Sequence, residues 1–286
     1  MKMIIFGANG MLGSVLKNQY QEWELITPSH AECDFSQKQH IRSFIDSIQP
    51  DIVINAAAIV NIDACEKDKN AALNVNGLAV AEIAMACNKY HAYFVQISTD
   101  HYYINDGSLK HTEEAPIHLV NYYAQTKFMG ETYALLADKH LIVRTNIIGF
   151  KARPNQPTFL EWAIDKILNK EKIDLFSDYS TSSIDIYHFS EILKLLITKK
   201  VCGTFNVGAN EVLSKSDFVK KLALKMQVSL NQPNICSVFN KANLIRRANS
   251  LGLDVKKIES VLNQPMPSSE EVIQKILEVY NDKYKN

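Results

Sequence analysis

The chain has 286 residues, of which 47% are hydrophobic, so it can bury a sizeable core and is not an intrinsically disordered protein. Its 31 basic and 31 acidic residues balance, which excludes the strongly basic surface of nucleic-acid binders and the polybasic patches of membrane-attached proteins. The sequence lacks a run of roughly 20 apolar residues, and Met3–Phe6 is shorter than the roughly 7–15 residues of a signal-peptide core. We therefore expect neither a membrane span nor a signal peptide.

The first half of the chain alternates short apolar segments with longer segments whose apolar residues recur at helical spacing. The predicted strands are Lys2–Ala8, Glu24–Thr27, Asp51–Ala57, Ala92–Ser98 and Leu141–Thr145. The predicted helices are Met11–Gln21, Gln37–Gln49, Asn70–Tyr90 and Tyr123–His140. This order predicts an α/β fold of the Rossmann type, in which a doubly wound parallel sheet is covered by helices on both faces.

After Gly149 the pattern becomes less regular. In chain order we expect a loop at Lys151–Pro157, a helix at Thr158–Asn169, an irregular polar stretch at Leu175–Ser183, a helix at Ile186–Lys199, a strand at Gly203–Gly208, and a mostly helical tail from Ser214 with a break at Gln264–Ser269. This predicts a dinucleotide-binding domain at residues 1–150, to which 186–208 returns. Residues 151–185 and 209–286 would form a smaller, mostly helical substrate-binding lobe. The apolar stripe from Val272 to Tyr280 indicates core packing, with a homodimer face as the alternative.

Three glycines follow the first predicted strand with the spacing G-x-x-G-x-x-G. In a dinucleotide-binding loop, Gly7 would permit the tight turn, Gly10 would let the backbone approach a pyrophosphate, and Gly13 would let the helix pack on the strand. The start of the helix offers N–H groups and the positive end of its dipole to the phosphates. The context of strand, loop and helix predicts a nicotinamide dinucleotide site that also includes three residues of the loop, Asn9, Met11 and Leu12.

The end of the second predicted strand bears on the choice of cofactor. The acidic residue that commonly follows this strand, where it binds a ribose 2′-hydroxyl and repels a 2′-phosphate, is missing after Glu24–Thr27. Ser29 and His30 can donate hydrogen bonds there, with an ordinary loop histidine as the alternative for His30. The sequence therefore favours NADPH over NADH.

Tyr123 and Lys127 are four residues apart, which places a phenol and an ammonium group on one face of a predicted helix. Reduction of a carbonyl needs a proton at the oxygen as hydride reaches the carbon, and a nearby Lys⁺ stabilises the phenolate. Thr99 follows the fourth predicted strand, at the edge where open parallel sheets bind ligands. We predict that these three residues are catalytic, with an exposed Tyr–Lys helix pair as the alternative.

Five dispersed cysteines without a C-x-x-C pair are typical of reduced thiols in a cytosolic protein. The eight histidines show no H-x-x-x-H or H-E-x-x-H spacing, so we expect no metal site. The sequence thus predicts a cytoplasmic protein that binds neither nucleic acid nor membranes.

Short motifs occur along nearly the whole chain, densely to about residue 150 and more loosely beyond. In chain order they are GANGMLG at 7–13, CDFS at 33–36, PDIVINAAA at 50–58, ISTD at 97–100, YAQTK at 123–127, LIVRT at 141–145, GTFNVGA at 203–209 and RRANSLGLD at 246–254. With them the chain resembles the extended short-chain dehydrogenase/reductase superfamily and, within it, the dTDP-4-dehydrorhamnose reductase-like sugar nucleotide reductases. The resemblance implies NAD(P)H-dependent reduction of a keto group on a nucleotide-activated deoxysugar, for cell-surface polysaccharide or related sugar biosynthesis.

The resemblance also implies further cofactor-binding residues. Asp34 and Phe35 would lie by the adenine, and three alanines, Ala56, Ala57 and Ala58, would line the cofactor groove together with Ser98, Tyr123 and Lys127. Asn74 would be a structural or cofactor-side residue, with local hydrogen bonding as the alternative.

On the substrate side, the sequence predicts Thr99, Asp100, His101, Asn146, Ile147, Arg153 and Arg247 as binding residues. The arginines, with Arg246, are candidates for the diphosphate because a guanidinium binds phosphate oxygens in a bidentate fork; surface salt bridges are the alternative. Three positions depart from the family pattern: His101 replaces a Tyr, Ile147 replaces an aromatic residue of the sugar pocket, and DYSTSSI at 178–184 lacks the usual Gly and Pro. We therefore predict the same chemistry on a related keto sugar nucleotide.

Two other functions stay open. A nucleotide-sugar epimerase of the same superfamily would keep its cofactor oxidised, and a regulatory subunit would bind a nicotinamide nucleotide without catalysis. A dehydratase fits less well, because the segment at 99–101 is T-D-H rather than T-D-E and lacks the second carboxyl group.

Overall fold

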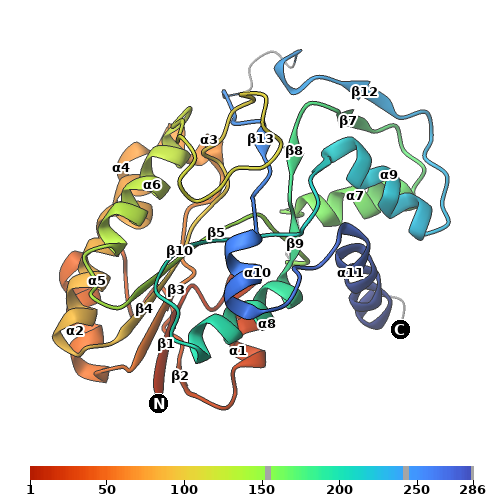
Figure 1. Ribbon diagram of the computed structural model, residues 1–286. Helices are drawn as coiled ribbons and strands as arrows, with labels where there is room; N and C mark the ends of the chain where they lie inside the picture. Colours follow the sequence, from red (N-terminus) through yellow and green to blue (C-terminus); the bar gives the residue numbers. More distant parts are fainter. Residues whose placement is uncertain (152–155, 241–244, 285–286) are drawn as a thin grey trace.

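A central parallel sheet organises the computed structural model, which describes residues 1–151, 156–240 and 245–284 (Figure 1). Its strands are β1 (Lys2–Phe6), β2 (Glu24–Ile26), β3 (Ile52–Asn55), β4 (Tyr93–Ile97), β5 (His140–Thr145) and β10 (Gly203–Val207). They are hydrogen-bonded in the order β10-β5-β4-β3-β1-β2, and every neighbouring pair is parallel. The predicted α/β fold with a doubly wound parallel sheet is confirmed.

The strand order creates a crevice at the carboxyl ends of β1 and β3. After β1 the chain adds β2 on one side and then crosses to add β3 on the other. Gly7 follows β1 and Ala56 follows β3. Open parallel sheets bind ligands where the winding direction reverses in this way. The fold thus places the glycine loop at its natural binding edge.

Helices cover both faces of the sheet, because the strands carry apolar side chains on both sides. On one face lie α2 (Lys38–Ile48), α5 (Ala79–Lys89) and α6 (Tyr122–Ala134). On the other face, α1 (Met11–Gln19) packs against α8 (Ile186–Thr198). Figure 1 shows the first group at the left and the second below the sheet.

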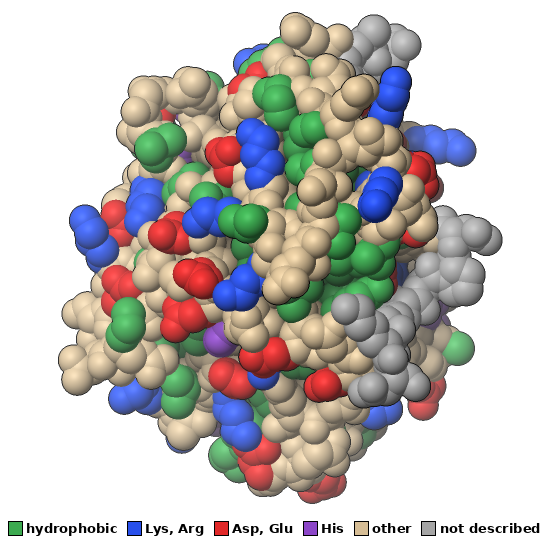
Figure 2. Space-filling view, turned by 90° about the vertical axis from the view of Figure 1, so that its right-hand side faces the viewer, with side chains coloured by type: hydrophobic (Ala, Val, Ile, Leu, Met, Phe, Trp, Pro, Cys, Tyr) green, Lys and Arg blue, Asp and Glu red, His purple; other side chains and the backbone are tan. Residues whose placement is uncertain are grey.

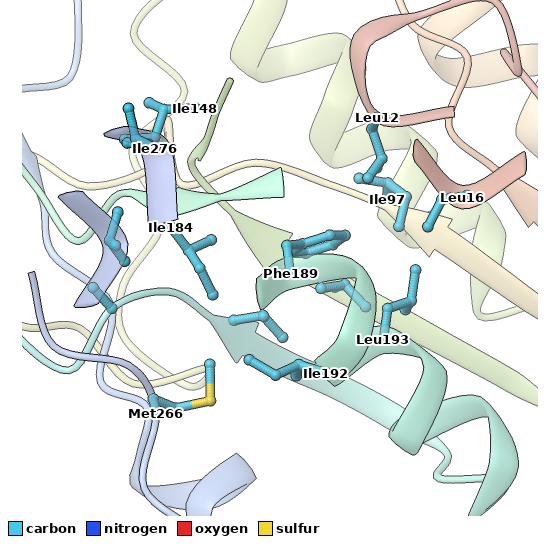
Figure 3. Close-up of a cluster of buried hydrophobic side chains, with 14 of the residues drawn as sticks. Leu12, Leu16, Ile97, Ile148, Ile184, Phe189, Ile192, Leu193, Met266 and Ile276 are labelled. Carbon is cyan, nitrogen blue, oxygen red and sulfur yellow. The ribbon is translucent and has the colours of Figure 1, made fainter. Parts of the chain in front are cut away.

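Phe189 of α8 lies at the centre of the second face. Its ring points toward Leu12 of α1 and Ile97 of β4, and further apolar side chains continue the cluster to Ile184 and Ile276 (Figure 3). Burial of an apolar side chain of this size contributes about 1.5–3 kcal/mol. The core of the sheet therefore continues into the C-terminal part of the chain.

The remaining elements are shorter. They are α3 (Ile62–Lys67), α4 (Lys69–Ala72), β6 (Ile147–Ile148), α7 (Phe159–Leu168), β7 (Asp174–Phe176), β8 (Ser180–Thr181), β9 (Ile184–Asp185), β11 (Leu213–Ser214), α9 (Lys215–Lys225), β12 (Asn234–Cys236), β13 (Ser250–Leu251), α10 (Lys256–Leu262) and α11 (Ser269–Tyr284). The expected irregular stretch at Leu175–Ser183 contains β8 and most of β7. The tail is helical in α9, α10 and α11, but residues between α9 and α10 form β12, β13 and a short 3-10 helix instead.

Two predicted helices differ from the structure. The helix expected at Tyr123–His140 ends at Ala134, because His140 already pairs with Phe94 of β4 and the chain must turn before it. Asn88 holds that turn, since its side chain donates to the Leu136 carbonyl (2.7 Å) and accepts from Asp138 N (2.8 Å). The helix expected at Asn70–Tyr90 contains a π-helical turn, Leu73–Leu78, between α4 and α5.

The apolar stripe near the C-terminus belongs to the core. Val272, Ile273 and Ile276 of α11 are all at most 2% exposed and join the cluster around α8. The core interpretation is therefore confirmed for these residues, whereas Leu277, Val279 and Tyr280 are half-buried.

The molecular surface carries charges of both signs. Figure 2 shows the face at the right-hand side of Figure 1, where basic and acidic side chains are interspersed among apolar ones. Among the described residues, none of the helices combines the length and the apolar character needed to cross a membrane.

Candidate active site

A cavity of about 1200 Å³ opens at the carboxyl edge of the sheet. The glycine loop forms one wall, the segments after β3 and β4 form the floor, and Tyr123 and Lys127 of α6 border it. Residues 145–147, Lys151 and residues 156–158 form the opposite wall. The cavity thus brings together the predicted cofactor loop and the predicted catalytic residues, which are far apart in sequence.

The glycine loop has the shape that a pyrophosphate requires. Gly7 has φ +80°, and a Cβ there would lie 2.7 Å from the backbone of Ala56. A Cβ on Gly13 would overlap the carbonyl oxygen of Gly7. Gly10 caps α1 without a side-chain hydrogen bond, and the first turn of α1 carries no acidic residue. Free N–H groups and an uncompensated helix dipole therefore face the cavity, which fits a dinucleotide phosphate.

Tyr123, Lys127 and Thr99 meet beside this loop. Asn121 caps the start of α6 by accepting from Ala124 N (2.9 Å), so Tyr123 lies in the first turn of the helix. Thr99 and Tyr123 border the same cavity, and Lys127 Nζ donates to the Ile97 carbonyl (2.8 Å). The i,i+4 spacing that suggested the pair is thus realised on a buried helix face.

Burial sets the proton affinities of the pair. Burial raises the pKa of Tyr123, and the hydrogen bond from Thr99 only partly opposes this. Burial lowers the pKa of Lys127 to about 8, while Glu131 raises it. At neutral pH, Tyr123 therefore keeps its proton and can donate it, and Lys127 is largely charged.

Asp100 forms the floor next to Thr99 and is fully buried. Burial raises its pKa to about 7, opposed first by the hydrogen bond from Asn146 and then by the charge of Lys215. Asn146 Nδ2 donates to Asp100 Oδ2 (2.8 Å), and Asn146 Oδ1 accepts from Ser183 (2.8 Å). The predicted substrate-side residues Asp100 and Asn146 thus belong to one hydrogen-bonded chain.

His101 stands between two tyrosine side chains. Its ring meets Tyr123 edge-on with 5.4 Å between centroids, and Nε2 is 3.4 Å from the Tyr179 hydroxyl. Burial, then the charges of Arg247 and Lys215, lower its pKa to about 3, so the ring is neutral near pH 7. Its Nδ1 is buried without a hydrogen-bond partner among the described residues.

The predicted adenine-side residues lie beyond β2, outside the cavity wall. The Ser29 hydroxyl donates to Glu32 Oε2 (2.7 Å), and His30, with an 86% exposed side chain, is 3.7 Å from Asp34. Phe35 is buried and packs edge-on against Phe6 (5.1 Å). The Ser29 hydroxyl, which was expected to face a phosphate, is thus hydrogen-bonded to Glu32. This carboxylate was not among the predicted site residues.

The other predicted residues divide in two groups. The cavity wall contains Gly10, Met11, Leu12, Gly13, Ala56, Ala58, Ser98, Thr99, Asp100, His101, Tyr123, Lys127, Asn146 and Ile147. Gly7, Asn9, Ala57 and Arg247 lie outside this wall. Arg247 is 3.8 Å from Asp63, and Arg153 lies outside the described residues. The functional roles of all these residues stay predictions.

Three residues near the cavity were missed. Asn76 rather than Asn74 is buried, and its side chain accepts from Ile59 N (2.8 Å) and donates to Ile59 O (3.0 Å), which holds the loop after β3. Thr145 lines the cavity, and its hydroxyl has no partner among the described residues. Lys215 lies over the Phe159 ring (4.2 Å) and acts on Asp100. The Asn-x-Asn pair was visible in the sequence; Lys215 had no local signal.

Comparisons with known proteins identify the family of the chain. The family model of the RmlD substrate binding domain matches residues 1–281. The chain is 25% identical to the probable low-salt glycan biosynthesis reductase Agl14 of Haloferax volcanii, over 99% of both chains. It is 34% identical to the dTDP-4-dehydrorhamnose reductase of Burkholderia thailandensis, over 46% of this chain and 44% of that enzyme. The structure of the Bacillus anthracis dTDP-4-dehydrorhamnose reductase in complex with NADP superposes with a TM-score of 0.88 at 24% identity, covering 97% and 99% of the two chains, and so shares the fold.

Proposed function

The chain belongs to the RmlD substrate binding domain family, and on this basis we propose that it is an NAD(P)H-dependent oxidoreductase that reduces a keto group on a nucleotide-activated deoxysugar. The product would serve the synthesis of a cell-surface polysaccharide or a related glycan. The observation that carries the proposal is the single cavity that joins the Gly10–Gly13 loop to Thr99, Tyr123 and Lys127. That cavity provides a phosphate cradle and a proton donor at one edge of the sheet.

Each residue has a defined task in this proposal. When bound, NADPH or NADH supplies the hydride for the carbonyl carbon. Tyr123 donates its proton to the carbonyl oxygen, and the Thr99 hydroxyl donates a hydrogen bond to the same oxygen. Lys127 stabilises the phenolate that Tyr123 leaves behind.

The side chains on the substrate side of the cavity favour a sugar nucleotide other than the one that the relatives use. His101 is neutral and ordered by Tyr179, so it offers a hydrogen bond rather than a charge. Ile147 gives the opposite wall an aliphatic surface. We expect these two side chains to select the keto sugar, and Arg247 and Arg153 to serve the diphosphate.

For location and assembly, we propose that the enzyme acts in the cytoplasm, in keeping with its five unpaired cysteines. A homodimer stays a prediction. Analytical ultracentrifugation of the purified chain would measure the assembly directly.

The test is a titration with NADPH and NADH, followed by assays with a panel of keto sugar nucleotides. We expect micromolar or tighter binding of one dinucleotide and its oxidation in the presence of at least one keto sugar. A cofactor that purifies with the protein in oxidised form, with interconversion of epimers, would replace the proposal by the epimerase alternative. Binding of the dinucleotide without any turnover would favour the regulatory alternative.

A further inference from the structure

Glu131 of α6 lies beneath the candidate active site and is only 4% exposed. It follows Lys127 by four residues, so both side chains lie on one face of the helix. Glu131 Oε1 accepts from the Ser98 hydroxyl (2.5 Å) and from Arg144 Nε (3.0 Å), and Oε2 accepts from Arg144 Nη2 (2.8 Å). One carboxylate therefore ties α6 to the ends of β4 and β5.

The direction of the hydrogen bonds fixes the orientation of Ser98. An ionised carboxylate only accepts, so the Ser98 hydroxyl gives its single proton to Glu131. The Tyr102 hydroxyl, 3.0 Å from Ser98 Oγ, must then be a donor to Ser98. Side chains alternate along an extended segment, so a Ser98 side chain held toward α6 turns Thr99 toward the cavity. The proton of the Ser98 hydroxyl is thereby committed to this network.

The same network holds three charges close together. Arg144 Nη1 also donates to the Tyr103 hydroxyl (2.9 Å) and the Glu113 carbonyl (2.9 Å). Both members of the ion pair therefore make hydrogen bonds to other residues as well as to each other. With Lys127, the pair gives a buried cluster of two cations and one anion. Other titratable groups beside Lys127 are Cys65 of α3, which interacts with it, and Asp100, His101 and Tyr123, which border the same cavity. Of these, Cys65 alone joins Glu131 in favouring the charged lysine.

We propose that Glu131 is a positioning residue that keeps Lys127 charged and fixes the Ser98–Thr99 corner against α6, while Arg144 sets how much of that negative charge Lys127 senses. The consequence for catalysis rests on the proposed function, because it assumes that Lys127 assists Tyr123. The electrostatic relation itself belongs to the free protein. It can therefore be tested without any substrate.

The two members of the ion pair should act on Lys127 with opposite sign. Glu131→Gln removes the anion and leaves Arg144 as an uncompensated cation, which disfavours a charged lysine. Arg144→Gln removes the competing cation and leaves the carboxylate to Lys127, which favours a charged lysine. If the two residues only supported the fold, the two variants would not shift the titration of Lys127 in opposite directions. The double variant, with two neutral amides in place of the pair, should give Lys127 a titration midpoint between those of the two single variants.

The experiment follows the lysine Cε resonances of ¹³C-lysine-labelled protein as a function of pH, with Lys127 assigned by its loss in Lys127→Arg. We expect the midpoint of Lys127 to fall by about one pH unit in Glu131→Gln and to rise by about one pH unit in Arg144→Gln. Lys215 is the internal control, because its pKa is also lowered to about 8 but it interacts with Asp100. Its midpoint should stay unchanged in both variants. Thermal melts of all variants identify any that are unfolded, and the double variant then serves in their place.

Equal midpoints in the two single variants, or shifts in the same direction, would overturn the inference. The pH profile of kcat provides the second measurement: activity should fall as pH rises through the Lys127 midpoint, at lower pH in Glu131→Gln than in the wild type. Opposed shifts without turnover on any keto sugar nucleotide would leave this inference standing and reject the proposed function. Turnover of a keto sugar nucleotide with unshifted Lys127 midpoints would support the proposed function and reject this inference.

Discussion

Tyr123 is a buried phenol whose pKa is raised, so it enters the proposed reaction as a proton donor. Replacement by Phe keeps the ring and removes the proton. We expect Tyr123→Phe to lower kcat by about 10²–10⁴-fold, because this is the usual contribution of a general acid, with little change in the dissociation constant for NADPH. Steady-state kinetics and a fluorescence titration would measure the two quantities. Tyr122→Phe is the matched control: Tyr122 is adjacent but its ring lies under Lys69 of α4, so activity should persist.

Glu32 follows β2, in the segment from which we predict the choice between the two nicotinamide cofactors. Its carboxylate accepts from Ser29 N (2.8 Å) and from the Ser29 hydroxyl, and these bonds lower its pKa. A carboxylate near the end of β2 opposes a 2′-phosphate. We therefore expect Glu32→Gln to raise the preference for NADPH over NADH by about two- to fivefold, a small change because solvent screens an exposed charge. Titrations of the wild type and of Glu32→Gln with NADPH and with NADH would measure this ratio. An unchanged ratio would place Glu32 away from the cofactor.

At the scale of residues, the sequence was informative where the chemistry depends on local spacing. Gly7, Gly10 and Gly13 share one turn, and Tyr123 and Lys127 share one helix face, so each group could be predicted from its own segment. Contacts between distant segments had no such signal. Lys215 acts on Asp100, and Ser183 reaches it through Asn146, only after α9 and the segment around β8 have docked.

At the scale of elements, the periodicity predicted which segments form strands and helices more reliably than where they end. The end of α6 depends on the register of β5 against β4, and the π-helical turn before α5 depends on the close packing of α6: a Cβ on Gly130 would overlap the Asn76 carbonyl oxygen. Both are tertiary effects that a single segment does not encode. The short strands β7 and β12 pair across about 60 residues for the same reason. The division into residues 1–150 with 186–208 and a separate lobe stays a prediction.

The start of α8 carries a proton-dependent contact. Asp185 caps this helix by accepting from Tyr187 N and His188 N, both at 3.0 Å, and its other oxygen is 2.5 Å from His188 Nδ1. Hydrogen bonding to Asp185 raises the pKa of His188 above its ordinary value of 6.5. The contact therefore stabilises the protein fully below about pH 6.5, and its contribution is lost as pH rises through the higher pKa of the folded state.

We accordingly expect His188→Gln to weaken the protein more at about pH 6 than at about pH 8. Glutamine keeps a hydrogen bond to Asp185 but does not titrate. Differential scanning calorimetry across this range would show the Tm difference between variant and wild type shrinking as pH rises. A constant difference would mean that the protonated imidazole does not contribute.

At the scale of the whole molecule, one apolar cluster joins the sheet, α8 and α11, and Phe189 is fully buried at its centre. We expect Phe189→Ala to lower the free energy of unfolding by about 3–5 kcal/mol, because the cavity it leaves cannot collapse between α1 and β4. Leu224→Ala is the control, since Leu224 is 79% exposed and its loss should cost less than about 0.5 kcal/mol. Urea denaturation would measure both. Similar losses would contradict a core centred on α8.

The pairing of β10 with β5 has a consequence for the synthesis of the chain. Along the ribosome, β5 emerges long before β10, because residues 146–202 separate them. At about 5–20 residues per second, the nascent sheet presents an unpaired edge with the sequence Leu-Ile-Val for several seconds. Such an edge is a template for pairing with other chains. Production of this protein at high expression levels should therefore depend on chaperones that cover β5 until its own partner strand arrives.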